Sequence, residues 1–224
     1  MELIHAKFSK MLFLVIAMAA VGQITNTIYV PAMGMIAHAM HVRPENVQAL
    51  MASYLLPYGI SQFIYGPLSD RYGRRPIVLI GLVIFFLGSM IAALALDFKM
   101  LLIGSIVQGS GVGVAGVMAR TVMRDCYTDQ KLQRANVYVS VALIFAPLLA
   151  PIIGGVLATW FSWRADFLFL LAFAVFVLVV EYYLFPETNM VIQERYREKG
   201  RMLKAYGAVL RTPTFLAYMM TLVL

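Results

Sequence analysis

Charged residues are scarce in this sequence, and those present are gathered in short segments. Of the 224 residues, 13% are Asp, Glu, Lys or Arg and 62% are hydrophobic, and the mean hydropathy is +0.82. A soluble domain carries roughly 25% charged residues. The shortage of charge therefore excludes an ordinary soluble globular domain and favours a chain that resides in a lipid bilayer.

Cysteine is nearly absent as well. The single Cys126 cannot form an internal disulfide, which excludes a disulfide-stapled scaffold. No His, Cys, Asp or Glu cluster has metal-ligand spacing, and the sequence contains no nucleotide-binding fingerprint. We therefore expect no cofactor, no metal, no enzymatic activity and no ATP-driven pump. The net charge of +7 has no soluble face to occupy, so we also expect no nucleic-acid partner.

Long uncharged runs are what the sequence does contain. They cover residues 11–41, 46–69, 76–96, 100–119, 135–163 and 167–180, and the last run continues to 185 with one acidic interruption. Each run reaches or approaches the ~20 residues with which a helix crosses the bilayer. Residues 213–224 begin a seventh run that is too short to span. The sequence thus predicts an all-α integral membrane protein, with a six-transmembrane-helix bundle over 11–186 and the start of a seventh helix.

The basic residues predict the orientation of this bundle. Fifteen of the 18 Lys and Arg residues lie on one side of the predicted spans and three lie on the other. The side that is rich in Lys and Arg normally faces the cytoplasm. We therefore expect a cytoplasmic N-terminus over 1–10 and a cytoplasmic central loop over 187–212. The helical spacing of apolar residues in that loop fits an amphipathic helix on the membrane surface, and a solvated linker fits equally well.

The loop after the second run carries the most specific motif, GPLSDRYGRRP over residues 66–76. Gly66 would let another backbone approach closely, and Gly73 would permit the positive φ of a sharp turn. This spacing resembles the cytoplasmic signature of the major facilitator superfamily. The resemblance implies a gating motif made of Gly66, Asp70, Arg71, Gly73, Arg74 and Arg75.

The fifth run carries small residues and prolines at four-residue spacing, which suits close helix packing in lipid. Its segment 146–155 resembles the antiporter motif of the same superfamily, found mostly in exporters. Pro147, Pro151, Gly154 and Gly155 would then belong to a tight helix that prevents leak. Generic packing of small residues remains an alternative explanation.

Segments 119–125, 163–167 and 186–188 resemble the Bcr/CflA branch of drug:proton antiporters. That branch implies proton-coupled export of amphipathic drugs across the bacterial inner membrane by alternating access between two six-helix halves. Two positions depart from the usual pattern. Ser105 stands where relatives have an arginine linked to proton transfer, and Thr27 stands where many have an aspartate. Proton coupling must therefore differ, or use acids outside this chain.

Polar residues within the runs are expected to face the bundle interior, because polar groups are costly in hydrocarbon. They predict a substrate path that is rich in rings and hydrogen-bonding groups but poor in charge, which suits amphipathic, often aromatic or cationic solutes. For any single one of them, packing between helices is the better explanation. The candidates are Gln23, Asn26, Thr27, Tyr54, Tyr58, Ser61, Gln62, Tyr65, Ser105 and Gln108.

Two charged residues within the runs are candidate proton or charge sites. Glu181 is the only acid inside a predicted span, although extension of its side chain to the membrane surface would explain it. Arg120 lies near an inner helix end, where Asp125 or lipid phosphates could pair with it.

The predicted function is that of an exporter half. Its expected partners are a small amphipathic substrate, protons, the lipid bilayer and a C-terminal six-helix half, supplied in cis, in trans or by a homodimer. Export of a metabolite such as an amino acid or sugar is an alternative. A non-transporting half that needs a partner is another.

Overall fold

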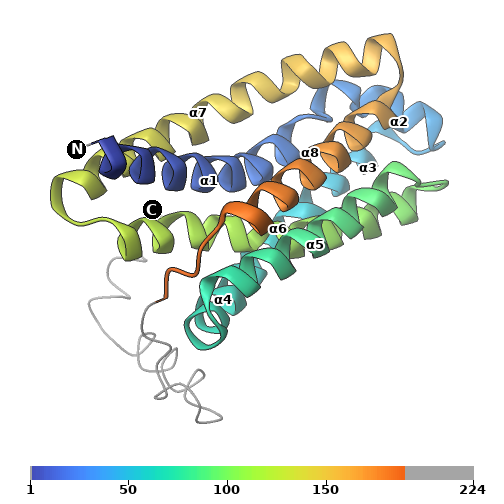
Figure 1. The fold of residues 1–224 in the computed structure, drawn as a ribbon. Coiled ribbons are helices and arrows are strands. Elements are labelled where there is room, and N and C mark those ends of the chain that lie inside the picture. The colour runs from blue at the N-terminus through green and yellow to red at the C-terminus, as the bar shows by residue number, and fades with distance from the viewer. Residues whose placement is uncertain (1, 190–224) are drawn as a thin grey trace, which may run out of the picture.

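The computed structural model describes residues 2–189, with side chains from residue 9 onward, and this part of the chain is helical (Figure 1). Short elements lie together at one end of the bundle, after the first long helix. The long helices are α1 (Glu2–Thr27), α4 (Ala49–Tyr72), α5 (Arg74–Ala93), α6 (Phe98–Cys126), α7 (Asp129–Trp160) and α8 (Trp163–Leu184), and the short elements are η1 (Val30–Ala32), α2 (Met33–Ala39) and α3 (Pro44–Val47).

Within residues 2–189, five helical segments are long and apolar enough to cross a membrane. The first, Ser9–Ala39, runs from α1 into α2, and the others are α5, α6, α7 and α8. The remaining long helix, α4, has 24 residues, which at ~1.5 Å per residue also suffices to span. Its tyrosines and serines lower its hydropathy. The predicted all-α membrane bundle is confirmed.

The first predicted span is not one continuous helix. α1 ends at Thr27, and the chain continues through η1, which has a proline in its first turn, into α2. Proline lacks a backbone N–H and its ring clashes with the preceding helical turn. Pro31 therefore marks the place where the 11–41 run is broken.

α6 packs against α5, α4 and α1, and its glycines permit the close approach. A Cβ on Gly109 would meet the carbonyl of Tyr54 in α4, and one on Gly111 would meet the backbone N of Phe85 in α5. Only glycine fits at such backbone contacts. α4 and α5 are thereby held on two sides of α6.

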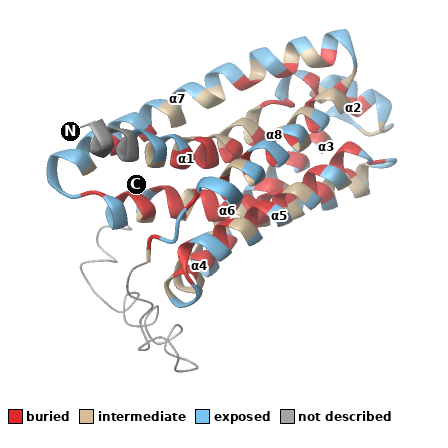
Figure 2. Ribbon diagram, in the orientation of Figure 1, coloured by how far each residue is buried: buried red, intermediate tan, exposed pale blue. Residues whose placement is uncertain are grey.

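The long helix α7 packs mainly against α1 and exposes most of its other side chains, as Figure 2 shows. Its exposed residues are large and apolar, with Ile144, Leu148 and Ile152 each more than 60% exposed at four-residue spacing. Such a surface suits contact with lipid. The predicted seventh helix over 213–224, and the central loop except for its first three residues, lie outside the described residues.

Candidate functional site

A tight turn joins α4 to α5 and brings the charged motif together. Gly73 has a φ of 99°, as the sequence predicts, and it is the C-cap of α4 and the N-cap of α5. Asp70 therefore stands at the end of one helix and Arg74 at the start of the next. Any residue with a Cβ would be strained at this backbone conformation.

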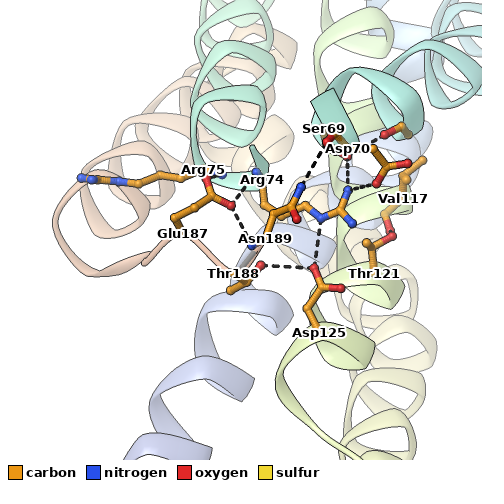
Figure 3. A network of polar contacts seen from close by, with 11 residues as sticks. Ser69, Asp70, Arg74, Arg75, Val117, Thr121, Asp125, Glu187, Thr188 and Asn189 are labelled. Atoms are coloured by element: carbon orange, nitrogen blue, oxygen red, sulfur yellow. Dashed lines mark hydrogen bonds and ion pairs between the residues drawn. The ribbon is translucent and has the colours of Figure 1, made fainter. Parts of the chain in front are cut away.

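The Arg74 guanidinium is the centre of a polar network, which Figure 3 shows. Its side chain is only 9% exposed. It pairs with Asp70, donates from Nε to Oδ2 of Asp125 over 3.0 Å, and donates to the hydroxyl of Ser69 over 2.6 Å. One cation thus ties together the C-terminal ends of α4 and α6 and the N-terminal end of α5.

The chain that follows α8 closes this network from the other side. The carboxylate of Glu187 accepts hydrogen bonds from the backbone N–H groups of Arg74 (2.8 Å) and Arg75 (3.1 Å). A carboxylate at this place also interacts favourably with the helix dipole of α5. The Asn189 amide donates to the carbonyl of Asp70 over 3.2 Å, and the Thr188 hydroxyl lies 3.4 Å from Oδ2 of Asp125.

Sequence reasoning used the segment 186–188 only as a mark of resemblance and missed its contacts. Glu187 and Arg74 are 113 positions apart, so no local pattern could pair them. The available signal was an acid directly after a predicted span, on the side where the basic turn lies.

Two members of the predicted gating motif lie apart from Asp70. Arg71 stacks on the ring of Tyr72, 5.0 Å from its centroid, and Arg75 donates to the carbonyl of Tyr182 over 2.8 Å. The expectation for Gly66 was wrong. A Cβ there would meet only the Val117 side chain at 3.8 Å, an ordinary contact, so no backbone approaches closely.

The predicted antiporter motif lies on α7, where its small residues face α1 and η1. A Cβ on Gly154 would collide with the carbonyl of Ile28, so the two backbones are in close contact. Gly155 has room, since its Cβ would lie 3.7 Å from Pro31. Pro147 and Pro151 are half-buried within a helix that stays continuous through both of them.

A cavity of about 330 Å³ lies between α1, α4, α6 and α7. Three of the predicted path residues line it, namely Gln23 of α1 and Tyr58 and Gln62 of α4. Asn136 and Ser140 of α7 line the opposite wall, and sequence reasoning missed both. Their four-residue spacing on a predicted span was the signal that could have found them.

The other predicted path residues do not line this cavity. Ser105 and Gln108 are buried in the contact between α5 and α6, where the Gln108 amide donates to Ser89 over 3.0 Å. Tyr54 is buried and its hydroxyl donates to the carbonyl of Gly22 over 2.8 Å, which ties α4 to α1. Ser61 and Tyr65 are buried along α4, while Asn26 and Thr27 lie half-buried at the C-terminal end of α1.

The charge of the cavity differs from the expectation. Arg120 and Arg124 of α6 both line it, whereas a wall poor in charge was predicted. Arg120 was also considered as a partner of Asp125, but that carboxylate pairs with Arg74 instead. The reason is the helical rotation of α6, which directs its residues 120 and 124 to one side and residue 125 to another.

Two buried carboxyl groups lie in α8. Glu181 is 0% exposed, so its side chain does not extend to the surface as the sequence suggested. Asp166, to which the sequence analysis gave no role, is also 0% exposed. Neither carboxyl group has a hydrogen-bond partner within the described part of the chain.

The sequence matches a protein-family model and several curated proteins. The family model for the Major Facilitator Superfamily matches residues 12–224. The chain is 41% identical over 213 residues to Multidrug resistance protein D of Escherichia coli (strain K12), which covers 95% of this chain and 53% of that protein. It is 27% identical over 161 residues to the Bicyclomycin resistance protein homolog of Haemophilus influenzae, covering 72% of this chain and 40% of that protein.

The fold is also similar to the folds of solved structures. A crystal structure of the peptide transporter POT matches with a TM-score of 0.70 at 17% identity, covering 96% of this chain and 46% of that one. The chain spans about half the length of the curated relatives it matches. With a matching family model, a matching helical fold and the charged turn between α4 and α5, the chain belongs to the major facilitator superfamily.

Proposed function

We propose that this chain is the N-terminal half of an inner-membrane exporter that moves amphipathic compounds outward in exchange for protons. The observation that carries the proposal is the polar cavity enclosed by α1, α4, α6 and α7 within a bundle of membrane helices. A concave site with few, convergent polar groups is typical of small-molecule binding. The names of the relatives, which refer to multidrug and bicyclomycin resistance, support export of drug-like compounds.

The network around Arg74 serves in this proposal as the gate of the alternating-access cycle. It joins α4, α5, α6 and the segment after α8 through contacts of 2.6–3.4 Å. A two-state equilibrium needs a difference of only a few kcal/mol between its states. Forming and breaking these contacts would stabilise one state of the cycle against the other.

Glu181 is the proposed carrier of the coupled proton. It is fully buried, and its carboxyl oxygens have no partner in the described residues. An isolated ionised carboxylate is costly in such surroundings, so the group is neutral at rest. A conformational change that exposes it to water would release the proton.

The test of export uses this chain, purified together with a second six-helix half, in lipid vesicles with an acidic lumen, and two dansyl dyes with permanent charges. One dye ends in a sulfonate and the other in a trimethylammonium group, so neither follows the pH gradient as a weak acid or base. The expected result is uptake of at least one dye that stops when nigericin collapses the gradient. Uptake equal to that of protein-free vesicles, with the second half supplied as well, would reject the proposal.

The role of Glu181 is tested by comparing Glu181→Gln with Glu181→Asp in the same vesicles. Glutamine keeps the shape but cannot release a proton, so gradient-driven uptake should fall at least tenfold while dye binding persists. Aspartate retains a titratable group and should keep part of the uptake. Full uptake by Glu181→Gln would assign the proton to another residue.

A further inference from the structure

The cavity walls carry positive charge without a matching negative charge. Arg120 and Arg124 line the cavity, and no Asp or Glu is among its lining residues. The nearby acids of the inner end, Asp70 and Asp125, are both ion-paired to Arg74. Among the described residues, neither cavity arginine takes part in an ion pair. Within residues 9–189, two cations therefore face the cavity without a paired acid.

Neutral hydrogen-bond donors converge on the same place. A Cβ on Gly116, one helical turn before Arg120, would lie 2.7 Å from the Tyr58 hydroxyl and 2.9 Å from the Gln62 amide nitrogen. The side chains of α4 thus lie directly over the face of α6 that carries the arginines. Guanidinium, amide N–H and phenol O–H groups can all donate to one anionic headgroup.

Apolar side chains also line the cavity. They are Ala19, Ala115, Ala119, Val139 and Leu143, and they alternate with the polar Gln23, Asn136 and Ser140. The arginines lie in the last two turns of α6, at its predicted cytoplasmic end. Their charge, together with the apolar lining residues, suits a solute that has both an anionic group and apolar surface.

We propose that this cavity selects amphipathic anions, with Arg120 and Arg124 binding the anionic group. The inference rests on the proposed function and names its substrate class. It also reverses the expectation of cationic solutes, because two uncompensated guanidinium groups repel a cation at close range. An anionic lipid headgroup offers the same chemistry as a free solute, so the experiment separates these two sources.

The experiment measures equilibrium binding of the two dansyl dyes to the 224-residue chain in phosphatidylcholine nanodiscs. The sulfonate dye should bind at least tenfold more tightly than the trimethylammonium dye, since charge-assisted hydrogen bonds are the strong ones. Arg120→Gln and Arg124→Gln should each weaken sulfonate binding about tenfold, leaving binding of the cationic dye unchanged or improved. Arg120→Lys should retain part of the affinity.

Arg134→Gln is the matched control, because it removes the same charge from the same predicted side of the membrane without touching the cavity. Size-exclusion profiles show whether each variant is folded. Four results would each overturn the inference. They are equal binding of both dyes, tighter binding of the cationic dye, no binding of either dye at concentrations up to roughly 1 mM, and unchanged sulfonate binding when Arg120→Gln and Arg124→Gln are combined.

Nanodiscs that contain phosphatidylglycerol identify the source of the anion. Weaker sulfonate binding there shows that the lipid headgroup occupies the same site, and unchanged binding shows that the site selects the free solute. Both results support an amphipathic-anion site. Binding is measured without a gradient, so anion-selective binding with no gradient-driven uptake would reject export alone. Uptake of the cationic dye in preference would reject the anion inference alone.

Discussion

Arg74 is the residue at which the polar contacts around the turn between α4 and α5 meet. Its guanidinium contacts three side chains, and its backbone N–H donates to a fourth, so α4, α5, α6 and the segment after α8 are joined at one position. Removing one partner of a largely buried ion pair leaves the other charge uncompensated, which costs more than the pair contributes. The effect of any variant here therefore depends on which partner is lost.

Asp70→Asn should slow transport far more than it reduces the amount of protein in the membrane. The amide keeps the shape of the carboxylate but leaves Arg74 with one acid, Asp125, to pair with. We expect transport about tenfold slower, which corresponds to ~1.4 kcal/mol, measured with the vesicle assay and the second half present. Asp129→Asn, which neutralises an exposed acid on the same predicted side, is the control. A normal transport rate for Asp70→Asn would mean that the network only fixes the orientation of the chain in the membrane.

At the scale of the helix, small residues decide how closely elements approach. Gly154 and Gly155 are neighbours in sequence and both belong to the predicted antiporter motif. Only the first is pressed against backbone, at Ile28, because successive helix positions point about 100° apart. The face of α7 that contains Gly154 is therefore packed against backbone, whereas the neighbouring face that contains Gly155 is packed more loosely.

Gly154→Ala and Gly155→Ala should have different effects on the stability of the bundle. The first places a methyl group against the Ile28 carbonyl and should destabilise the bundle by about 1–3 kcal/mol, as overpacking does. The second has room beside Pro31 and should be neutral or stabilising by up to about 1 kcal/mol, because alanine favours helix over glycine. Thermal unfolding of the two variants in detergent measures this difference. Equal effects would mean that α7 is free to shift on α1.

At the scale of the whole molecule, orientation follows from the distribution of basic residues. Cys126 is exposed at the end of α6, on the side where most Lys and Arg residues lie. A membrane-impermeant thiol reagent should label it only in opened vesicles. The opposite control is Leu96→Cys in the Cys126→Ser background. Leu96 is 86% exposed between α5 and α6. A cysteine at this position should therefore be labelled in intact cells. Labelling of Cys126 in intact cells would reverse the topology.

The chain should need a second six-helix half for transport. The cavity is enclosed by α1, α4, α6 and α7 of one bundle, while transporters of this type bind substrate between two repeats. We expect vesicles with this chain alone to show no gradient-driven uptake, and activity to appear when a second half is supplied. The mass of the particle in detergent completes the measurement. Uptake by a one-copy particle would contradict the half-transporter model, and uptake by a two-copy particle would indicate a homodimer.

The sequence by itself determined the class of fold, the long helices apart from the break after Thr27, and the turn between α4 and α5. Each of these depends on one segment at a time. A run without charge spans hydrocarbon whatever its neighbours do, because a helix satisfies its own backbone hydrogen bonds. Gly73 likewise adopts its positive φ for local reasons. These features could be predicted without any knowledge of packing.

Only the tertiary structure decided which polar residues meet. Gln108 and Arg120 belong to the same helix, yet one is buried against α5 and the other lines the cavity. The rotation of a membrane helix about its axis is set by the shapes of its neighbours, because lipid is as apolar as the side chains and no hydrophobic force orients the helix. The contact of Glu187 with the start of α5 depends in the same way on how α8 packs against α5. Sequence spacing specifies a face of each helix, and packing alone specifies what that face touches.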